Sequence, residues 1–213
     1  MTGIKVCGLT RREDVNAAVE SGINALGFIL AESPRRVSLE QVAELTRGLP
    51  PFISTVAVVM NPQKRMLERV IASDLFSHIQ FHGQEDPAML LGHKLKTIKT
   101  FSIATEADLK DIENYQGADY FLFDTRVGRT SGGTGRTFNW ELLKKILPGK
   151  PFILAGGLGP DNVTEAIRIC RPSAVDLNSR LEREPGKKDR ELIREAVLRV
   201  HESDFSILRS ETL

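Results

Sequence analysis

The chain has 213 residues, enough to bury a full core as a single domain, and 29 Lys and Arg nearly balance 28 Asp and Glu. A formal net charge of +1 excludes a strong long-range field, so we expect neither nucleic acid nor membrane as a partner. Apolar runs stop at roughly half a dozen residues, far below the ~20 of a membrane helix. Two distant cysteines without a CxxC pair, and no leader-like start, predict a reducing, cytoplasmic setting.

Short apolar runs alternate with helical patterns along the chain. The first run, around Ile4 and Val6, precedes a helix that ends near Gly22, and Thr10 with Glu13 has the spacing of a capping box. Ser38 with Gln41 repeats that spacing before the second helix. Further predicted strands cover residues 25–30, 55–59, 78–83, 96–100, 120–124, 151–155 and 174–177, and helical patterns lie around 62–71, 86–90, 105–114, 142–146, 163–167 and 192–197.

Eight strand-then-helix units with continuous apolar strands predict a parallel sheet covered by helices. Eight such units close a barrel, so the expected fold class is α/β, a single-domain (β/α)8 TIM barrel over residues 1–202. A doubly wound open sheet is the alternative, but its GxGxxG fingerprint is missing after the first strand. Residues 203–213 lack a clear pattern and are expected to form a loosely ordered tail.

In such a barrel the carboxyl ends of all eight strands meet on one face. Cys7, His82 and Asp124 end predicted strands, and Arg35 follows another, so we expect these side chains to converge. A helix N-terminus after Cys7 favours a thiolate, although a buried inert cysteine fits the same stretch. The glycine-rich run 132–135 allows either backbone contact with an oxyanion or a lid without ligand contacts.

The loops after strands seven and eight carry small and polar residues. Gly156 and Gly157 follow the seventh strand, and Asn178 and Ser179 follow the eighth. Barrels of this kind often bind phosphate there through backbone amides, so these four residues are the predicted phosphate-binding site.

Several blocks, in order along the chain, together resemble the phosphoribosylanthranilate isomerase family. These blocks are KVCGLT (5–10), ALGF (25–28), SPR (33–35), QFHG (80–83), FDT (123–125), GGTG (132–135) with Phe138 and Trp140, LAGGL (154–158), DLNSRLE (176–182) and PGKKD (185–189).

The resemblance implies an Amadori rearrangement in tryptophan biosynthesis, without metal or cofactor. It converts the small phosphorylated substrate N-(5-phosphoribosyl)anthranilate to 1-(2-carboxyphenylamino)-1-deoxyribulose 5-phosphate. By resemblance, Cys7 is the general base, with a lowered pKa, and Asp124 is the general acid, protonated before it acts.

The resemblance also assigns three substrate-binding positions. Arg35 is placed near the anthranilate moiety, where its alternative is a solvated surface arginine. His82 matches a position near the site, although a histidine at a strand end also satisfies loop carbonyls. Asp176 either orders the site or touches the substrate. Phe138 and Trp140 are expected to pack under the sixth loop, and Cys170 in the core.

The eighth loop departs from the family's usual DVSSGVE, because Arg180 stands where glycine is common. Arg180 is grouped with the phosphate-binding residues, and two arrangements are open. It either reaches over the phosphate or turns outward to pair with Glu182 or Glu184, and we favour the outward arrangement.

Three alternative functions remain open for this sequence. The histidine-pathway isomerase has a similar barrel and chemistry but an aspartate at the position of Cys7, and indoleglycerol-phosphate synthase uses a lysine acid that no strand end here matches. A catalytically silent phosphate-binding barrel is the non-enzymatic alternative. Either a monomer or a homodimer is compatible with the sequence.

Overall fold

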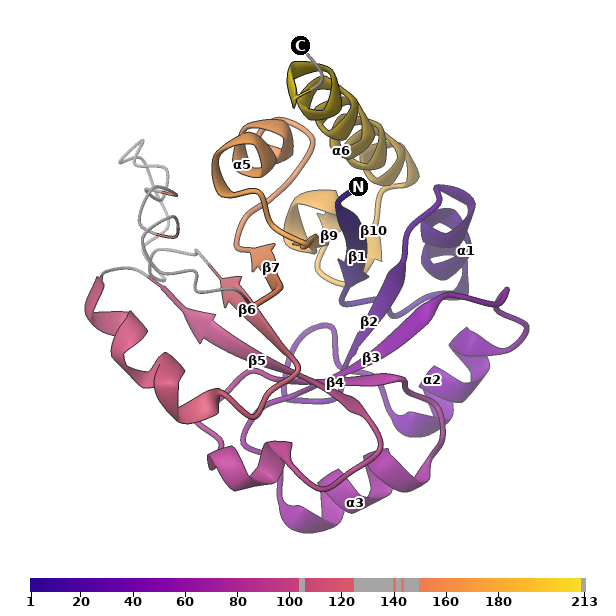
Figure 1. Ribbon diagram of the computed structural model, residues 1–213. Coiled ribbons are helices and arrows are strands. Elements are labelled where there is room, and N and C mark those ends of the chain that lie inside the picture. The colour runs from indigo at the N-terminus through magenta and orange to yellow at the C-terminus, as the bar shows by residue number, and fades with distance from the viewer. Residues whose placement is uncertain (104–105, 125–139, 141–142, 144–149, 212–213) are drawn as a thin grey trace.

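The computed structural model describes residues 1–103, 106–124, 140, 143 and 150–211. Eight parallel strands form a closed barrel in which each strand pairs with the next and the eighth returns to the first (Figure 1). The predicted (β/α)8 barrel is therefore confirmed, and the doubly wound sheet is wrong. The strands are β1 (Gly3–Cys7), β2 (Ala25–Ile29), β3 (Ser54–Val59), β4 (His78–Phe81), β5 (Lys96–Ser102), β6 (Tyr120–Asp124), β7 (Phe152–Ala155) and β8 (Ala174–Leu177).

Helices cover the outside of the strands (Figure 1). Two predicted helices are 3₁₀ helices, η1 after its Asp86 cap and η2 in place of the helix expected at 105–114. The predicted helix at 142–146 lies mostly outside the described residues, although Leu143 is buried. The described helices are α1 (Arg12–Glu20), α2 (Leu39–Thr46), α3 (Lys64–Ala72), η1 (Pro87–Leu90), η2 (Glu106–Tyr115), α5 (Val163–Cys170), η3 (Ser179–Leu181) and α6 (Arg190–Glu211), and a short hairpin joins β9 (Glu182–Glu184) to β10 (Lys187–Lys188).

Alternation along each strand separates two layers of side chains. On β1, Ile4 and Val6 belong to the large core between strands and helices. Because successive strand residues point to opposite faces, Lys5 and Cys7 point into the barrel. A second, small apolar cluster fills part of the barrel interior with Val56, Ile98, Leu122 and Ala155. The outer layer provides most of the buried apolar surface, so the inner layer has room for polar side chains.

One of the two predicted capping boxes is present. Ser38 and Gln41 cap α2 reciprocally, as expected. The box at Thr10 is wrong, because α1 begins after Arg11 and no side chain caps it. The Thr10 hydroxyl instead donates to the carbonyl of Gly186 at 2.5 Å. A distant loop thus takes the hydroxyl that local spacing assigned to the helix.

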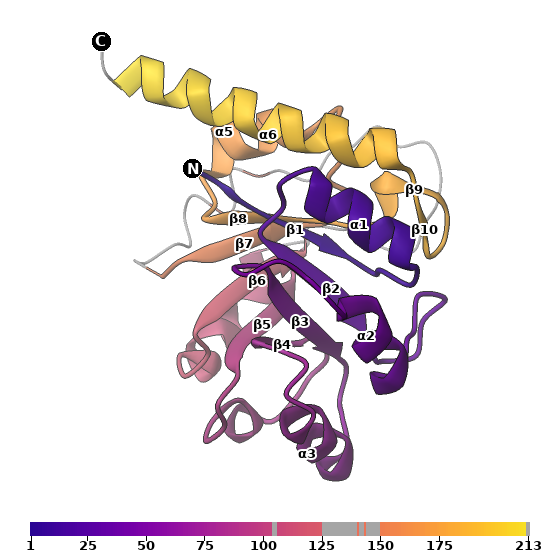
Figure 2. The same cartoon turned by 90° about the vertical axis from the view of Figure 1, so that its right-hand side faces the viewer.

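The C-terminal segment is a helix where a loose tail was expected. Helix α6 continues through residue 203 to Glu211 and crosses the barrel beside α5 (Figure 2). The buried carboxylate of Asp204 accepts hydrogen bonds from the backbone N–H and the hydroxyl of Thr2, at 2.6 and 2.7 Å. The expectation of a loosely ordered tail from residue 203 is therefore wrong, because this part of α6 anchors the start of β1. Within the described residues, no helix has the length and apolar character needed to cross a membrane.

Candidate active site

A pocket of about 60 Å³ lies at the carboxyl ends of the strands. Cys7 comes from the end of β1, Asp124 from the end of β6 and Asp176 from β8. The predicted residues that line this pocket are Cys7, His82, Asp124, Gly156, Gly157, Asp176, Asn178 and Ser179. The convergence expected from the barrel is confirmed for these eight residues, while Arg35 and Arg180 lie outside the lining.

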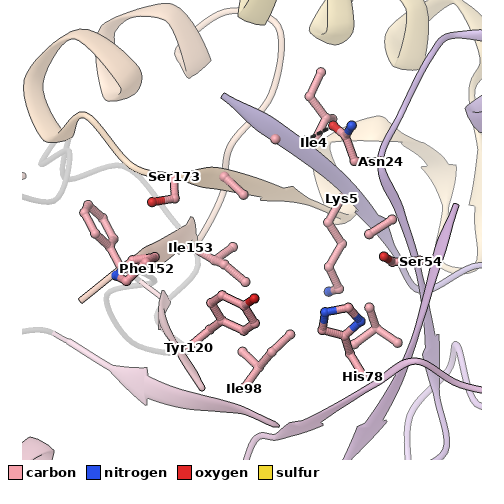
Figure 3. A pocket seen from close by; sticks show the side chains of 15 residues that line it. Ile4, Lys5, Asn24, Ser54, His78, Ile98, Tyr120, Phe152, Ile153 and Ser173 are labelled. Atoms are coloured by element: carbon pink, nitrogen blue, oxygen red, sulfur yellow. Dashed lines mark hydrogen bonds between the residues drawn. The ribbon is translucent and has the colours of Figure 1, made fainter. Parts of the chain in front are cut away.

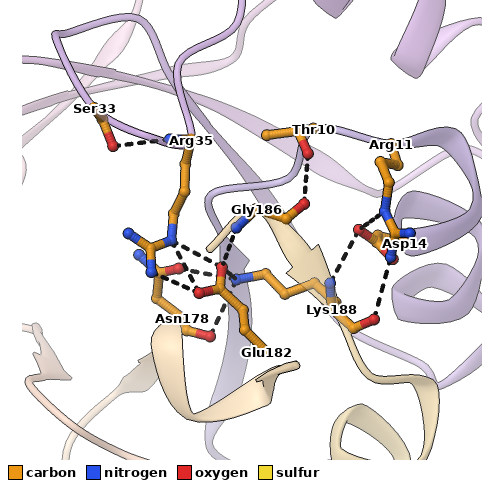
Figure 4. Close-up of polar contacts among 9 residues, drawn as sticks. All are labelled: Thr10, Arg11, Asp14, Ser33, Arg35, Asn178, Glu182, Gly186 and Lys188. Atoms are coloured by element: carbon orange, nitrogen blue, oxygen red, sulfur yellow. Dashed lines mark hydrogen bonds and ion pairs between the residues drawn. The ribbon is translucent and has the colours of Figure 1, made fainter. Parts of the chain in front are cut away.

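Arg35 lies near this pocket in an ion pair with Glu182. Its Nε and Nη2 donate to the two carboxylate oxygens at 2.8 and 2.5 Å (Figure 4). Arg35 also packs against the turn at Gly8, where a Cβ would meet its Cδ at 2.7 Å. Gly8 has a φ of 73°, so both its conformation and this close approach require glycine. The side chain is thus held at the edge of the site by a carboxylate that the sequence assigned to Arg180 instead.

Lys188, from β10, connects Glu182 to the eighth loop. Its buried ammonium donates to Glu182 Oε1 at 2.8 Å and to Asn178 Oδ1 at 2.9 Å (Figure 4). Burial raises the pKa of Glu182, but hydrogen bonds from Arg35 and Lys188 outweigh it and the pKa is lowered. For Lys188 the balance is different: burial lowers the pKa of the ammonium and outweighs the contacts with Glu182, which raise it. The network fixes the orientation of the Asn178 amide.

Cys7 has a charged neighbour that the sequence reading missed. Lys5 is buried and donates to Asp176 Oδ2 at 2.7 Å. Burial raises the pKa of the Cys7 thiol, while the Lys5 charge lowers it and the Asp176 charge raises it. The net pKa of Cys7 is raised, so the expected lowering is wrong. The physical reason is that burial outweighs the nearby positive charges, and α1 begins only at Arg12.

Gln80 is a second pocket residue that the strand pattern did not single out. Its Nε2 lies 3.2 Å from Thr100 Oγ1 and 3.4 Å from His82 Nδ1. The carbonyl oxygen of Gln80 and Oδ1 of Asp176 are buried and accept no hydrogen bond from the described residues. Both residues line the pocket. These two acceptor oxygens therefore belong to residues of the pocket, and the hydroxyl groups of a ligand would satisfy them as donors.

The loops after β7 and β8 meet beside the pocket. Gly156 and Gly157 have positive φ angles of 99° and 64°, which turn the seventh loop sharply. Arg180 pairs with Asp161 at 2.6 Å and donates to the carbonyl of Gly157 at 3.3 Å. The outward arrangement is thus present, but the predicted partners Glu182 and Glu184 are wrong. Asp161 lies on the seventh loop and was not visible as a neighbour in sequence.

Other sequence predictions fall outside the pocket. The run 132–135 and Phe138 lie outside the described residues. Cys170 is buried in the main core, as expected. Trp140 is buried in the same core, 3.9 Å from its carbonyl oxygen to the Cys170 thiol, but the sixth loop under which it was expected to pack lies outside the described residues.

A separate cavity of about 230 Å³ opens at the opposite, N-terminal end of the barrel. Ile98, Tyr120 and Ile153 point into it, and Lys5 extends from β1 beside them (Figure 3). Its lining is mostly apolar and contains neither Cys7 nor Asp124. Because barrel enzymes place their chemistry at the carboxyl ends of the strands, the smaller pocket is the candidate active site.

Comparison with known families decides the relationship. Residues 4–199 match the family model described as N-(5'phosphoribosyl)anthranilate (PRA) isomerase. The chain belongs to the phosphoribosylanthranilate isomerase family. The family named from the sequence blocks is therefore confirmed over almost the whole barrel.

Individual members of the phosphoribosylanthranilate isomerase family agree with this assignment. The enzyme of Petrotoga mobilis is 53% identical over 202 residues, which cover 94% of this chain and 98% of the relative. A crystal structure of the isomerase from Thermotoga maritima is 33% identical, with a TM-score of 0.86 over 95% of this chain and 100% of that one. Another structure, a complex with reduced 1-(o-carboxyphenylamino)-1-deoxyribulose 5-phosphate, is 31% identical with a TM-score of 0.83 over 95% of this chain and 100% of that one.

Proposed function

We propose that the chain catalyses the Amadori rearrangement of N-(5-phosphoribosyl)anthranilate in tryptophan biosynthesis, with Cys7 as general base and Asp124 as general acid. The observation that carries the proposal is the shared pocket, in which a thiol and a carboxyl group from two different strands lie beside the glycine turn after β7. Family membership supports the substrate, because the relatives are named for it.

The reaction needs one proton donated to the ring oxygen and one removed from C2, the two atoms on either side of C1. Asp124 protonates the furanose ring oxygen, the bond from that oxygen to C1 breaks, and the nitrogen lone pair forms a Schiff base. Cys7 then removes the proton from C2, and the C–H electrons form the enolamine, which tautomerises to the ketone. Cys7 and Asp124 end strands that lie three places apart around the barrel, β1 and β6, which lets them reach different sides of a ribose between them.

Two buried acceptors suit the hydroxyl groups of the sugar. Oδ1 of Asp176 and Oε1 of Gln80 accept nothing from the part of the chain that the structure describes. A buried acceptor without a partner costs about 1 to 3 kcal/mol, so a hydroxyl donor that fills it gains binding energy. In this proposal Asp176 contacts the substrate directly, and Gln80 joins it as a substrate-binding residue. His82, which Gln80 contacts, lines both this pocket and an adjacent one that contains Gly83 and Lys99.

The phosphate is assigned to the glycine turn after β7 and the start of the eighth loop. Positive φ angles at Gly156 and Gly157 suit a backbone that curves around an anion. Asn178 Oδ1 accepts from Lys188, so its Nδ2 is the side that remains for an anion. Ser179 supplies a hydroxyl next to it.

Arg35 is assigned to the anthranilate end of the substrate. The pair with Glu182 uses Nε and Nη2. A guanidinium has five N–H donors, so Nη1 remains as a donor toward the anthranilate carboxylate while the carboxylate of Glu182 fixes the plane of the group. This leaves Arg35 as a positioned contact and not as an acid or a base.

The direct test is turnover of freshly prepared phosphoribosylanthranilate, followed by the loss of its anthranilate-type fluorescence. We expect turnover without added metal or cofactor, and no turnover would overturn the proposal. The aminoimidazole substrate of the histidine pathway provides the comparison, and a kcat/KM that favours it would assign the chain to that reaction instead. A binding-only barrel would retain phosphate binding and turn over neither compound.

The phosphate assignment has its own test. A substrate that lacks the phosphate should lose kcat as well as affinity, because remote binding energy holds the ribose between acid and base. Inorganic phosphate should compete weakly. Equal kcat/KM for the two compounds would remove Gly156, Gly157 and Ser179 from the proposed phosphate site.

The assembly is proposed to be a monomer or a homodimer working in the cytoplasm. One related structure is described as monomers generated from a dimeric Thermotoga maritima enzyme, at 29% identity and a TM-score of 0.82. Sedimentation of the purified chain distinguishes the two states.

A further inference from the structure

Lys5 is a buried charge whose role the acid and base of the proposed function do not explain. It is 3% exposed and lies in the middle of an apolar strand. A charged group in such a place is costly unless it is paired, and its partners indicate what it is for. Lys5 has an ion-pair partner on β8 and a thiol neighbour on its own strand.

The first partner is Asp176. Lys5 and Asp176 are register partners on β1 and β8, and their side chains meet inside the barrel at 2.7 Å. Burial lowers the pKa of Lys5, but the charge of Asp176, together with that of Cys7 when it is a thiolate, outweighs it, so the pKa of Lys5 is raised. The raised pKa favours the charged ammonium over a neutral amine that could act as a base.

The second neighbour is the sulfur of Cys7. Residues 5 and 7 of one strand point to the same side, and Gly27 of β2 is the register partner of Cys7. A Cβ on Gly27 would lie 2.8 Å from Cys7 Sγ and 3.1 Å from Lys5 Cε. The thiol and the lysine stem therefore lie side by side above one glycine, and the charge of Lys5 lowers the pKa of the Cys7 thiol.

We propose that Lys5 is a positioning residue for the base: its ammonium, anchored by Asp176, lies on the same side of β1 as Cys7 and stabilises the thiolate that accepts the substrate proton. This inference rests on the proposed function, in which Cys7 is that base. Lys5 touches no reacting atom and acts only through the sulfur. The arrangement explains why the buried Cys7 thiol has a positive charge, that of Lys5, on its own strand.

Other charged groups face Cys7 and set the size of the expected effect. Asp176 on β8 opposes the thiolate, while Lys188 on β10 and Arg35 after β2 favour it. Of the positive charges, the one on Lys5 has the largest influence on the thiol. Removing the charge of Lys5 should therefore raise the pKa of the Cys7 thiol more than removing the charge of Lys188.

The test is the titration of Cys7 in the substrate-free protein. Thiolate absorbance in the ultraviolet is followed against pH in a Cys170→Ala background, with a Cys7→Ser variant subtracted. We expect Lys5→Met to raise the midpoint by about one pH unit or more, since an adjacent opposite charge shifts a pKa by roughly one to three units. Lys5→Arg should stay closer to the parent, because it keeps the charge. An unchanged or lowered midpoint in Lys5→Met would overturn the proposal.

Partner variants separate electrostatics from folding. Asp176→Asn should lower the midpoint, because it removes a like charge from the thiolate. The double variant Lys5→Met with Asp176→Asn leaves no unpaired buried charge and folds more readily than Lys5→Met alone. Its midpoint should lie above that of Asp176→Asn, and equality of the two would also overturn the proposal. Lys99→Met is the matched control: Lys99 is equally buried and paired with Glu85 at 2.7 Å, yet it should leave the Cys7 midpoint unchanged.

The same variants are then assayed for isomerisation. The acid limb of the kcat/KM profile reports the free enzyme's base, so it should move by the same amount and in the same direction as the titration. A thiol midpoint that moves while this limb stays fixed would overturn the catalytic use of Lys5. If the parent protein itself does not turn over phosphoribosylanthranilate, the proposed function fails. The titration still tests the effect of Lys5 on the Cys7 thiol, so the two failures can be told apart.

Discussion

The two ends of the barrel carry different side chains on the same strands. Strand β6 starts with Tyr120 at the N-terminal cavity and ends with Asp124 in the candidate active site. At the N-terminal end the inward residues are mostly apolar, whereas at the carboxyl end they include a thiol, two carboxylates and a side-chain amide. Stability and chemistry are thus divided along each strand, which allows the chemistry to change without unfolding the barrel.

The largest effect should come from the acid and base at the carboxyl end. Cys7→Ala and Asp124→Asn should each lower kcat by about two orders of magnitude or more, because each removes a proton-transfer group. Tyr120→Phe, at the other end of β6, is the matched control and should leave kcat within about twofold. Steady-state kinetics with circular dichroism checks this. Near-normal turnover of either active-site variant would remove that residue from its role.

The second comparison uses two glycines with positive φ. Gly8 and Gly22 have φ angles of 73° and 85°, but a Cβ on Gly8 meets Arg35 and Asn178 below 3 Å while one on Gly22 meets nothing within 4 Å. In both alanine variants the free energy of unfolding should fall by about 1 to 2 kcal/mol, because alanine is strained in the left-handed backbone conformation. Only Gly8→Ala should also lower kcat/KM, by roughly tenfold, since it displaces Arg35 and Asn178. Denaturant unfolding and kinetics separate the two contributions, and equal kinetics would show that the contact at Gly8 is unimportant.

The outer face of the barrel was predictable from sequence, because it follows one rule. Residues such as Ile4, Val6, Phe121 and Phe123 pack against helices, and their apolar character marks the strands. The strand ends, and with them Cys7 and Asp124, follow from the same pattern. Eight repeats then predict a closed barrel without any knowledge of pairing.

The inner face was harder to predict, because its partners lie on other strands. Lys5 looks like an interruption of an apolar run until Asp176 is seen opposite it on β8. Arg180 could not be matched with Asp161 from spacing alone, since the two lie on different loops. The direction of the Cys7 pKa was misjudged because the sequence shows a helix start but not the depth of burial.

The two ends should also titrate in different pH ranges. Burial lowers the pKa of His78, at the N-terminal cavity, from its usual value near 6.5. As pH falls, His78 therefore takes up a proton in the unfolded chain at a higher pH than in the folded protein. The free energy of unfolding should thus decrease as pH drops below about 6.5. The pKa of Glu182, at the carboxyl end, is also lowered, so its contribution is complete above about pH 4.5 and is lost as pH falls through the folded value.

Two variants assign these ranges. His78→Gln should flatten the stability curve between about pH 7 and pH 5, and Glu182→Gln should flatten it below about pH 4.5. Urea unfolding at a series of pH values measures both. If Glu182→Gln follows the parent curve in acid, the Arg35–Glu182–Lys188 network does not stabilise the carboxyl end.

The smallest effect should come from Arg180, the residue that departs from the family pattern. Arg180 lies in η3 without a positive φ, so the chain accepts its Cβ, and its side chain is 45% exposed in a pair with Asp161. Exposed pairs contribute about 0 to 1 kcal/mol, so Arg180→Gly should change KM by no more than about threefold. Asp161→Asn is the matched control, since it breaks the same pair and leaves the guanidinium in place.

These two variants decide how Arg180 relates to the phosphate. Similar, small and salt-insensitive changes in KM are expected, because backbone amides then carry the phosphate. A rise of roughly tenfold in Arg180→Gly alone, larger at low salt, would mean that the guanidinium contacts the phosphate when substrate binds. The contact with the Gly157 carbonyl, at 3.3 Å, places Arg180 near enough for that result to be physically reasonable, so the salt series is the deciding measurement.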